Sequence, residues 1–299
     1  MEVEYEKYFD QSIENLPEKI YSVLNNVPIK IKKDAVEIKL RVNRKIAINS
    51  NNKTYFLDFI LTTDLIKETF KAICNYSIHS HLEEIKKGFI TLKGGHRAGI
   101  CGTAVYENNK LINLKNISSI NLRIAKQIFG VAEPILKIFN NQPKKLLIVG
   151  PPASGKTTIL KDISKNLSEY SVSIVDSRGE IAASYDGTPQ NDIGNADVFS
   201  FFKRSDGIIF AIRTMNPEYI ICDEIGDEDD LTAIKVCVGT GVNLIATAHG
   251  ENLEEFRKRE ISKKILETKA FSTILILKGK NSPCEINSIV KVGDLVWKF

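Results

Sequence analysis

Residues 147–158 read LIVGPPASGKTT and contain the spacing GxxxxGK[ST], the pattern of a loop that binds nucleotide phosphates. The apolar run KKLLIVG precedes the loop, and TILKDISKNLSEY follows it with helical periodicity. In such a loop, backbone N–H groups at a helix N-terminus surround the phosphates, Lys156 reaches the β- and γ-phosphates, and the Thr157 hydroxyl is a ligand of Mg²⁺. The sequence predicts a site for ATP and Mg²⁺ formed by Gly150, Pro151, Pro152, Ala153, Ser154, Gly155, Lys156, Thr157 and Thr158.

A second apolar run, Tyr219–Cys222, ends in two adjacent carboxylates, Asp223 and Glu224. Acidic side chains at the end of so apolar a strand are costly unless a cation or a proton meets them, and this is a Walker B pattern. We expect Asp223 to hold Mg²⁺ through water and Glu224 to polarise the water that attacks the γ-phosphate. The alternative for Glu224 is a plain surface acid.

Two further predicted strands also end in polar groups. The run SVSIVDSRGE offers Asp176 and Glu180, so Glu180 competes with Glu224 for the role of catalytic base. The run VNLIATAHG ends in Thr247 and His249. Polar groups at the carboxyl ends of parallel strands converge on the ligand crevice of an open α/β sheet. We therefore expect His249 to sense the γ-phosphate instead of filling the core.

These groups need a buried sheet to position them. The strands that carry them are joined by helical segments, and NLEEFRKREISKKILE is a predicted helix before a fifth strand, STILILK. A strand inserted between the phosphate loop and the Walker B strand is typical of additional-strand ATPases, in contrast to simple nucleotide kinases. The predicted fold class is α/β, with a RecA-like P-loop domain and a mostly parallel central sheet over residues 144–299, after a linker at 126–143.

The first 125 residues show the patterns of a smaller α+β domain. VEIKLRV alternates strictly, and KIAINSNNKTYFLDF gives two more extended runs around an Asn-rich turn. Thr63 is the expected N-cap of the helix that follows. GFITLKGGHRAGICGTAVY is a second strand region, with a bend at Gly94-Gly95. We assign no catalytic constellation to this domain.

The basic side chains of the chain admit more than one interpretation. His79 and His81 form an HxH pair, but no Cys or third His stands at ligand spacing, so we expect no metal site there. His96 and Arg97 sit beside the double glycine and either reach out from the domain surface or are simply solvated. Arg213, before the Walker B strand, either contacts phosphate or a subunit interface, or is solvated.

The composition sets limits on class and compartment. The 299 residues are 43% hydrophobic and 26% charged, which is ordinary for a folded protein with two cores. A net charge of +4 neither requires nor excludes a nucleic acid or an anionic membrane as partner. The five cysteines form no CxxC pair and no apolar signal segment follows the acidic start, so a reducing cytosol is expected. No run reaches the roughly 18 apolar residues of a transmembrane helix, so any work at a membrane would be peripheral.

Taken in order, GPPASGKTT, the acidic box DSRGE, IRTMNPEYIICDEIG and IATAHG resemble the secretion-ATPase superfamily, the RecA-like motors of type II and type IV secretion and pilus assembly. Within it, EIKLRVNRKIAI, GFITLKGGHRAGICG and ISSINLRIAKQI are similar to the amino-terminal signatures of the stage III sporulation protein AA family. The resemblance covers almost the whole chain. It implies a hexameric ATPase, cytoplasmic and peripheral at the mother-cell face of a membrane, that docks on integral membrane proteins of a channel linking mother cell and forespore during endospore formation.

The resemblance also implies roles for individual residues. Lys156 and Thr157 match the phosphate loop, Asp223 and Glu224 match the Walker B pair, and His249 matches the histidine box. In this superfamily an arginine from a neighbouring subunit completes the site. The candidates for this arginine are Arg97, Arg123 and Arg213.

The chain departs from the family pattern at two places. The family's acidic box reads Asp-Glu-Arg-x-Glu, whereas residues 176–180 read DSRGE, so Ser177 stands where a carboxylate is expected. If the catalytic base belongs there, hydrolysis should be slow or should depend on Glu180 or Glu224. An arginine is also expected near Asn195, and its loss should weaken coupling between subunits.

Two alternatives to a motor ATPase remain open. A nucleotide-binding scaffold with little turnover would agree with the Ser177 departure. A RecA-like, DNA-directed motor would share every phosphate contact, but it should show a basic stripe with aromatic residues, and the lysines here are spread among acids. We therefore expect no nucleic-acid partner, and salt-dependent DNA binding would contradict this.

Overall fold

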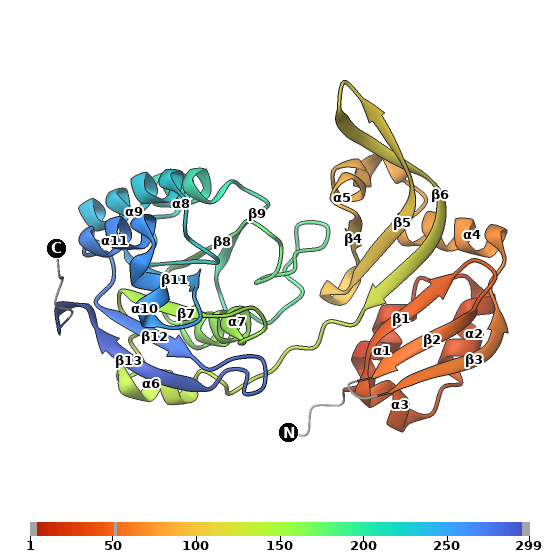
Figure 1. The fold of residues 1–299 in the computed structure, drawn as a ribbon, viewed down its shortest axis with the longest axis horizontal. Coiled ribbons are helices and arrows are strands. Elements are labelled where there is room, and N and C mark those ends of the chain that lie inside the picture. Colours follow the sequence, from red (N-terminus) through yellow and green to blue (C-terminus); the bar gives the residue numbers. More distant parts are fainter. Residues whose placement is uncertain (1–4, 51–52, 295–299) are drawn as a thin grey trace. The chain divides into compact units, whose positions relative to one another are not determined.

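The computed structural model describes residues 5–50 and 53–294 (Figure 1). Two compact units are present. Unit 1 takes the chain up to Lys126 together with Ala183–Gln190, and unit 2 takes Gln127–Ala182 and the chain from Asn191 onward. The predicted division at residues 125 and 143 stays a prediction. None of the helices in the described ranges combines the length and the hydropathy needed to span a bilayer.

Unit 1 is built on a six-stranded antiparallel sheet with the order β3-β2-β1-β6-β5-β4. Its strands are β1 (Ala35–Arg41), β2 (Lys45–Ser50), β3 (Thr54–Ile60), β4 (Phe89–Thr91), β5 (Arg97–Glu107) and β6 (Lys110–Arg123). Ile38 and Leu40 of β1 are fully buried, as the alternating pattern predicts. The predicted Asn-rich turn between β2 and β3 includes residues 51 and 52, which lie outside the described residues.

Short helices pack on this sheet and close its core. They are α1 (Glu6–Ile13), α2 (Glu18–Asn25), α3 (Ile29–Asp34), α4 (Thr63–Ile73), α5 (Leu82–Lys86) and the 3₁₀ turns η1 (Ile78–His81) and η2 (Lys93–Gly95). The N-cap of α4 is Thr62, whose side chain accepts a hydrogen bond from the N–H of Leu65. The prediction of Thr63 as the cap is wrong by one residue, because two adjacent threonines carry the same signal and only the backbone conformation separates them.

The double glycine forms a tight turn that buries the next residue. Gly94 and Gly95 have φ angles of 79° and 75°, which favour glycine. His96 is fully buried, and its Nδ1 accepts a hydrogen bond of 3.0 Å from the N–H of Ala125. Burial lowers the pKa of His96 to about 4. The expectation that His96 reaches out from the surface or is solvated is therefore wrong, and the neighbouring Arg97 lies over the ring of Phe89.

Residues 183–190 enter unit 1 from a distant part of the sequence. The side-chain oxygen of Gln190 accepts a hydrogen bond of 2.7 Å from the N–H of Gly94. The side-chain amide of Asn75 donates a hydrogen bond of 2.5 Å to the Tyr185 hydroxyl. Because Gly95 packs against Ala183, a side chain at Gly95 would collide with this segment. The glycine turn and the incoming segment therefore fit together only in the absence of a Cβ atom.

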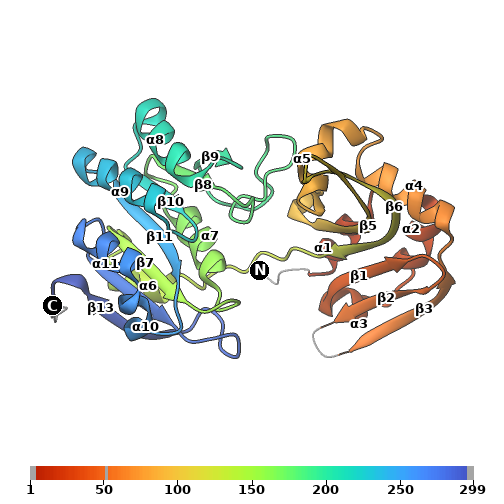
Figure 2. The same ribbon diagram turned by 45° about the horizontal axis from the view of Figure 1, so that its top comes forward.

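Unit 2 is built on a seven-stranded sheet with the order β13-β12-β7-β11-β10-β8-β9 (Figure 2). Its strands are β7 (Leu146–Gly150), β8 (Val172–Asp176), β9 (Asp197–Ser200), β10 (Tyr219–Cys222), β11 (Asn243–His249), β12 (Thr273–Leu277) and β13 (Ile286–Lys291). Every neighbouring pair is parallel except β12 with β13, so the predicted mostly parallel sheet is confirmed. The sequence analysis missed the two edge strands β9, which is only partly buried, and β13, which is largely exposed; neither carries a continuous apolar run.

Helices cover both faces of this sheet. They are α6 (Glu133–Ile138), α7 (Lys156–Asn166), α8 (Arg204–Met215), α9 (Glu228–Thr240), α10 (Leu253–Lys258) and α11 (Glu260–Glu267), with a 3₁₀ turn η3 (Val292–Asp294). Alternate residues of β7 pack into two separate cores, one with α6 and α7 and the other with α8 to α11. The helix predicted over residues 252–267 is divided at Arg259, whose backbone is extended. This packing fixes the carboxyl ends of β7, β8, β10 and β11 beside one another.

Candidate functional site

The phosphate loop connects the end of β7 to the start of α7, as predicted. Ala153 and Gly155 have φ angles of 59° and 90°, which curl the backbone before the helix begins. The first N–H groups of an α-helix have no acceptor within the helix, so those at the start of α7 are available to an anion. The loop therefore has the conformation of a phosphate cradle.

The side chain of Lys156 folds back and bonds to the backbone of this loop. Its ammonium group donates hydrogen bonds of 2.7 Å to the carbonyl of Gly150 and 2.8 Å to that of Pro151. The side chain is buried, and burial lowers its pKa, while the nearby carboxylates of Glu224 and Glu251 oppose the decrease. The ammonium group thus occupies the mouth of the cradle, where β- and γ-phosphate oxygens would replace the two carbonyls as its partners.

Asp223 lies at the centre of the candidate site. It follows β10, which is flanked by β8 and β11, and its side chain is almost fully buried. Burial, together with the charge of the neighbouring Asp176, raises the pKa of Asp223 to about 6, so the two carboxylates lie close together. The Ser177 hydroxyl donates a hydrogen bond of 3.3 Å to Asp223. Two buried acids that lie close together are a donor set that suits a hard cation such as Mg²⁺.

Asp176 itself has a structural role. Its carboxylate accepts three hydrogen bonds, from the N–H groups of Glu180 at 2.8 Å, Ile181 at 3.0 Å and Ala182 at 2.9 Å. These bonds fix the turn after β8 and place the Glu180 side chain near Asp223, whose pKa it helps to raise. Glu180 is therefore within the site, as one of the two carboxylates that the sequence offered as a base.

Glu224, the other proposed base, is held by two neighbours. Its φ angle is 45°, in the left-handed region, and its N–H donates a hydrogen bond of 2.8 Å to the Thr247 hydroxyl at the end of β11. Its carboxylate forms an ion pair of 2.5 Å with Arg178. The sequence analysis gave Arg178 no role of its own, although its position within the acidic box was the available signal. The carboxylate expected to polarise the attacking water is therefore already engaged by Arg178.

His249 ends β11 directly beside the phosphate loop. It pairs in register with Gly150, the first residue of the loop. Its carbonyl accepts a hydrogen bond of 3.0 Å from Arg259, which also pairs with Glu255 at 2.6 Å. The backbone of His249 is therefore anchored, and its partly buried side chain lies at the strand end where a γ-phosphate sensor was expected.

The three candidate arginines for action between subunits lie in different units. Arg97 and Arg123 are register partners on β5 and β6 of unit 1, so their side chains share one face of that sheet. Arg213 lies in the last turn of α8 in unit 2. Their predicted role toward a second subunit stays a prediction.

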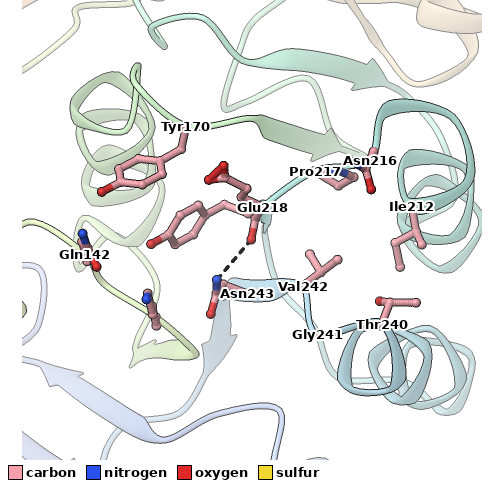
Figure 3. A pocket seen from close by; sticks show the side chains of 12 residues that line it. Gln142, Tyr170, Ile212, Asn216, Pro217, Glu218, Thr240, Gly241, Val242 and Asn243 are labelled. Atoms are coloured by element: carbon pink, nitrogen blue, oxygen red, sulfur yellow. Dashed lines mark hydrogen bonds between the residues drawn. The ribbon is translucent and has the colours of Figure 1, made fainter.

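A separate pocket of about 610 Å³ lies at the other end of the strands, away from the phosphate loop (Figure 3). Tyr219 and Asn243, the first residues of β10 and β11, line it, so it is at the amino ends of the strands. Figure 3 shows Gln142 and Tyr170 at one end and Ile212 at the other, with Asn243 bonded to the backbone of Glu218. This pocket is distinct from the phosphate cradle, which is at the carboxyl ends.

Comparisons with known proteins identify the family of this chain. The family described as "Sporulation stage III, protein AA" matches residues 7–294. Stage III sporulation protein AA of Bacillus subtilis (strain 168) is 34% identical over 285 residues, which cover 92% of this chain and 93% of that protein.

Two solved structures share the fold. The pilus retraction motor PilT with bound ADP has a TM-score of 0.58 at 15% identity and covers 92% of this chain and 78% of its own. The ATPase DotB of Legionella pneumophila has a TM-score of 0.55 at 18% identity and covers 82% of this chain and 72% of its own. These structures therefore establish a secretion-ATPase fold. The chain belongs to the stage III sporulation protein AA family.

Proposed function

We propose that this protein is an ATP-hydrolysing subunit of the secretion-ATPase type that energises a membrane channel complex between mother cell and forespore during endospore formation. The observation that carries the proposal is the buried Lys156 at the mouth of an anion cradle, with the Asp223 carboxylate nearby at the end of β10. The similarity to PilT with bound ADP supports nucleotide binding, and the family supports the sporulation role.

The residues of the site suggest how hydrolysis would proceed. Lys156 would leave the carbonyls of Gly150 and Pro151 and bind the β- and γ-phosphates, which the loop amides also contact. Thr157 and Asp223 would hold Mg²⁺, which neutralises charge that develops on the phosphates. Glu224 would accept the proton of the attacking water, after its ion pair with Arg178 is rearranged.

The assembly belongs to the same proposal. We place the protein at the mother-cell face of a membrane, as a hexameric ring docked on integral membrane proteins. An arginine from the next subunit would complete each site, with Arg97, Arg123 and Arg213 as candidates. Removing the correct arginine should leave ATP binding intact and lower turnover by about 10³-fold or more.

The test is steady-state ATP hydrolysis over a wide range of protein concentration, beside Lys156→Ala. The exposed Lys235→Ala on α9 provides a control with the same loss of charge. Specific activity should rise with concentration, vanish in Lys156→Ala and persist in Lys235→Ala. If activity equals that of Lys156→Ala at every concentration, the protein is not an ATPase on its own.

A second candidate function is a nucleotide-binding scaffold that assembles a membrane complex with little turnover. The ion pair between Arg178 and Glu224 favours it, because the guanidinium occupies the carboxylate oxygens that an attacking water would need, and Ser177 supplies no replacement. If the pair restrains catalysis, Arg178→Ala should raise turnover several-fold without changing ATP affinity. Lys203→Ala is the control, since it breaks an exposed ion pair with Asp229 away from the loop. No increase in Arg178→Ala would contradict this explanation.

A further inference from the structure

The order of the strands places different residues on the two sides of the phosphate loop. β7, which leads into the loop, lies between β11 on one side and β12 on the other. The carboxylates of Asp223 and Glu224 follow β10, beyond β11. Among the described residues, neither β12 nor β13 contributes a side chain to the acidic group described above. The acidic side and the opposite side of the loop are therefore chemically different.

The opposite side is formed by the turn that joins β12 and β13, residues 279–284, which we call the β12–β13 turn. Its last residue, Cys284, donates a backbone hydrogen bond of 2.8 Å to the carbonyl of Ser154 in the phosphate loop. The Cys284 sulfur lies 3.8 Å from the carbonyl of Gly155. A Cβ atom at Gly155 would collide with that sulfur. The turn is thus packed directly on the backbone of the loop.

The base of the turn is also braced. Lys278 and Glu285 face each other across the hairpin and form an ion pair of 2.8 Å, and their backbones share a hydrogen bond of 2.9 Å. Within the turn, the N–H of Ser282 donates a hydrogen bond of 3.0 Å to the carbonyl of Gly279. These bonds define the conformation of the turn, and the bond from Cys284 to Ser154 joins it to the loop. A rigid tip can present side chains to a ligand at little entropic cost.

We infer that the β12–β13 turn binds the nucleoside part of the nucleotide, and that Lys280 and Asn281 at its tip contact the ribose or the edge of the base. The inference rests on the proposed nucleotide site. Because the γ-phosphate must face Asp223 and Glu224, the nucleoside leaves the loop on the side away from them. The turn is the segment packed against the loop on that side.

The chemistry of the tip fits this ligand. Lys280 and Asn281 are exposed, and Ser282 is partly exposed, so an ammonium group, an amide and a hydroxyl are available at the rim of the loop. An amide can both donate to and accept from a base edge, and an ammonium group can bind ribose hydroxyl oxygens. An apolar tip would offer none of these bonds.

The test separates the nucleoside from the phosphates by comparing Mg²⁺–ATP with Mg²⁺–inorganic triphosphate as ligands. Calorimetric titrations use the wild-type protein, the double variant Lys280→Ala/Asn281→Ala, and Lys291→Ala as a control at the far end of β13. Loss of two polar contacts should weaken ATP binding by about 10-fold. Triphosphate affinity should stay unchanged in the double variant, and Lys291→Ala should change neither.

The possible outcomes are distinct. A loss confined to ATP supports the inference. Unchanged ATP affinity in the double variant overturns it, because the tip then makes no contact with the nucleoside. An equal loss for ATP and triphosphate also overturns it, since the turn would then act only by supporting the phosphate loop. If the wild-type protein binds neither ligand, the proposed nucleotide site itself fails, and the inference fails with it.

Discussion

Replacing Asp223 by asparagine should stabilise the protein while it removes a residue that we assign to the site. The ordinary pKa of the carboxyl is 3.8, and burial together with Asp176 raises it to about 6 in the folded protein. The difference corresponds to about 3 kcal/mol by which the folded state disfavours the ionised form. Asparagine carries no charge and still offers an oxygen to the Ser177 hydroxyl, so the Asp223→Asn variant avoids this cost.

The sign of the effect depends on pH in a defined way. Below about pH 4, Asp223 is protonated in both folded and unfolded protein, and the substitution gains nothing. Between pH 4 and 6 the unfolded chain loses its proton first, so the wild-type protein loses stability as the pH rises. Above about pH 6 the full cost is present. The gain from Asp223→Asn should therefore grow from zero to about 3 kcal/mol across this window.

Scanning calorimetry in EDTA, without nucleotide, measures this gain for the transition of unit 2 at about pH 4.5, near the acid end of the window, and at about pH 7.5, above it. Mg²⁺ with ATP should then stabilise the wild-type protein much more than Asp223→Asn. Asp176→Asn is the matched control, because that carboxylate accepts three backbone hydrogen bonds and its replacement should destabilise the fold. A gain that is independent of pH, or a loss at pH 7.5, would refute the reasoning.

Three further predictions concern other buried features. His96→Asn keeps a hydrogen-bond acceptor, so it should abolish the loss of about 3 kcal/mol that the buried imidazole imposes on unit 1 as the pH falls from about 6.5 to 4, measured by calorimetry. Gly155→Ala should abolish ATP binding in titrations because its Cβ has no space, whereas Gly239→Ala in α9 meets open space and should leave binding unchanged. Arg204→Ala should lower stability in urea unfolding by about 3 kcal/mol, since it leaves a buried carboxylate unpaired. Lys203→Ala, which breaks an exposed pair, should cost under about 1 kcal/mol.

The phosphate loop and the strands around it could be predicted from the sequence because their signals are local. A strand buried on both faces is a continuous apolar run, and the glycines and lysine of the loop stand at fixed spacing. The edge strands β9 and β13 carry no such run, since one side of each has no neighbouring strand. These two strands form because they pair with β8 and β12, and such pairing between distant residues leaves no pattern in the local sequence.

The details of the site depend on contacts between distant residues. The ion pair of Arg178 with Glu224 joins two strand ends that are adjacent only in the folded sheet. The burial of His96 likewise follows from its bond to Ala125, in a segment that continues β6. A basic residue beside two glycines resembles a surface loop in sequence, and the tertiary contact reverses that expectation. The sequence thus drew attention to these positions, but it did not predict that Arg178 pairs with Glu224 or that His96 bonds to Ala125.

The segment 183–190 has a consequence for how the protein forms during synthesis. The sheet of unit 1 is complete once β6 has been made, yet the acceptor of the Gly94 N–H is the side chain of Gln190, which is translated much later. The ribosome must therefore translate the phosphate loop and β8 before unit 1 can acquire its last piece. A fragment that ends at Lys126 would lack Gln190 and should be less stable than unit 1 in the whole chain. Unit 1 is therefore completed only after the first part of unit 2 has been synthesised.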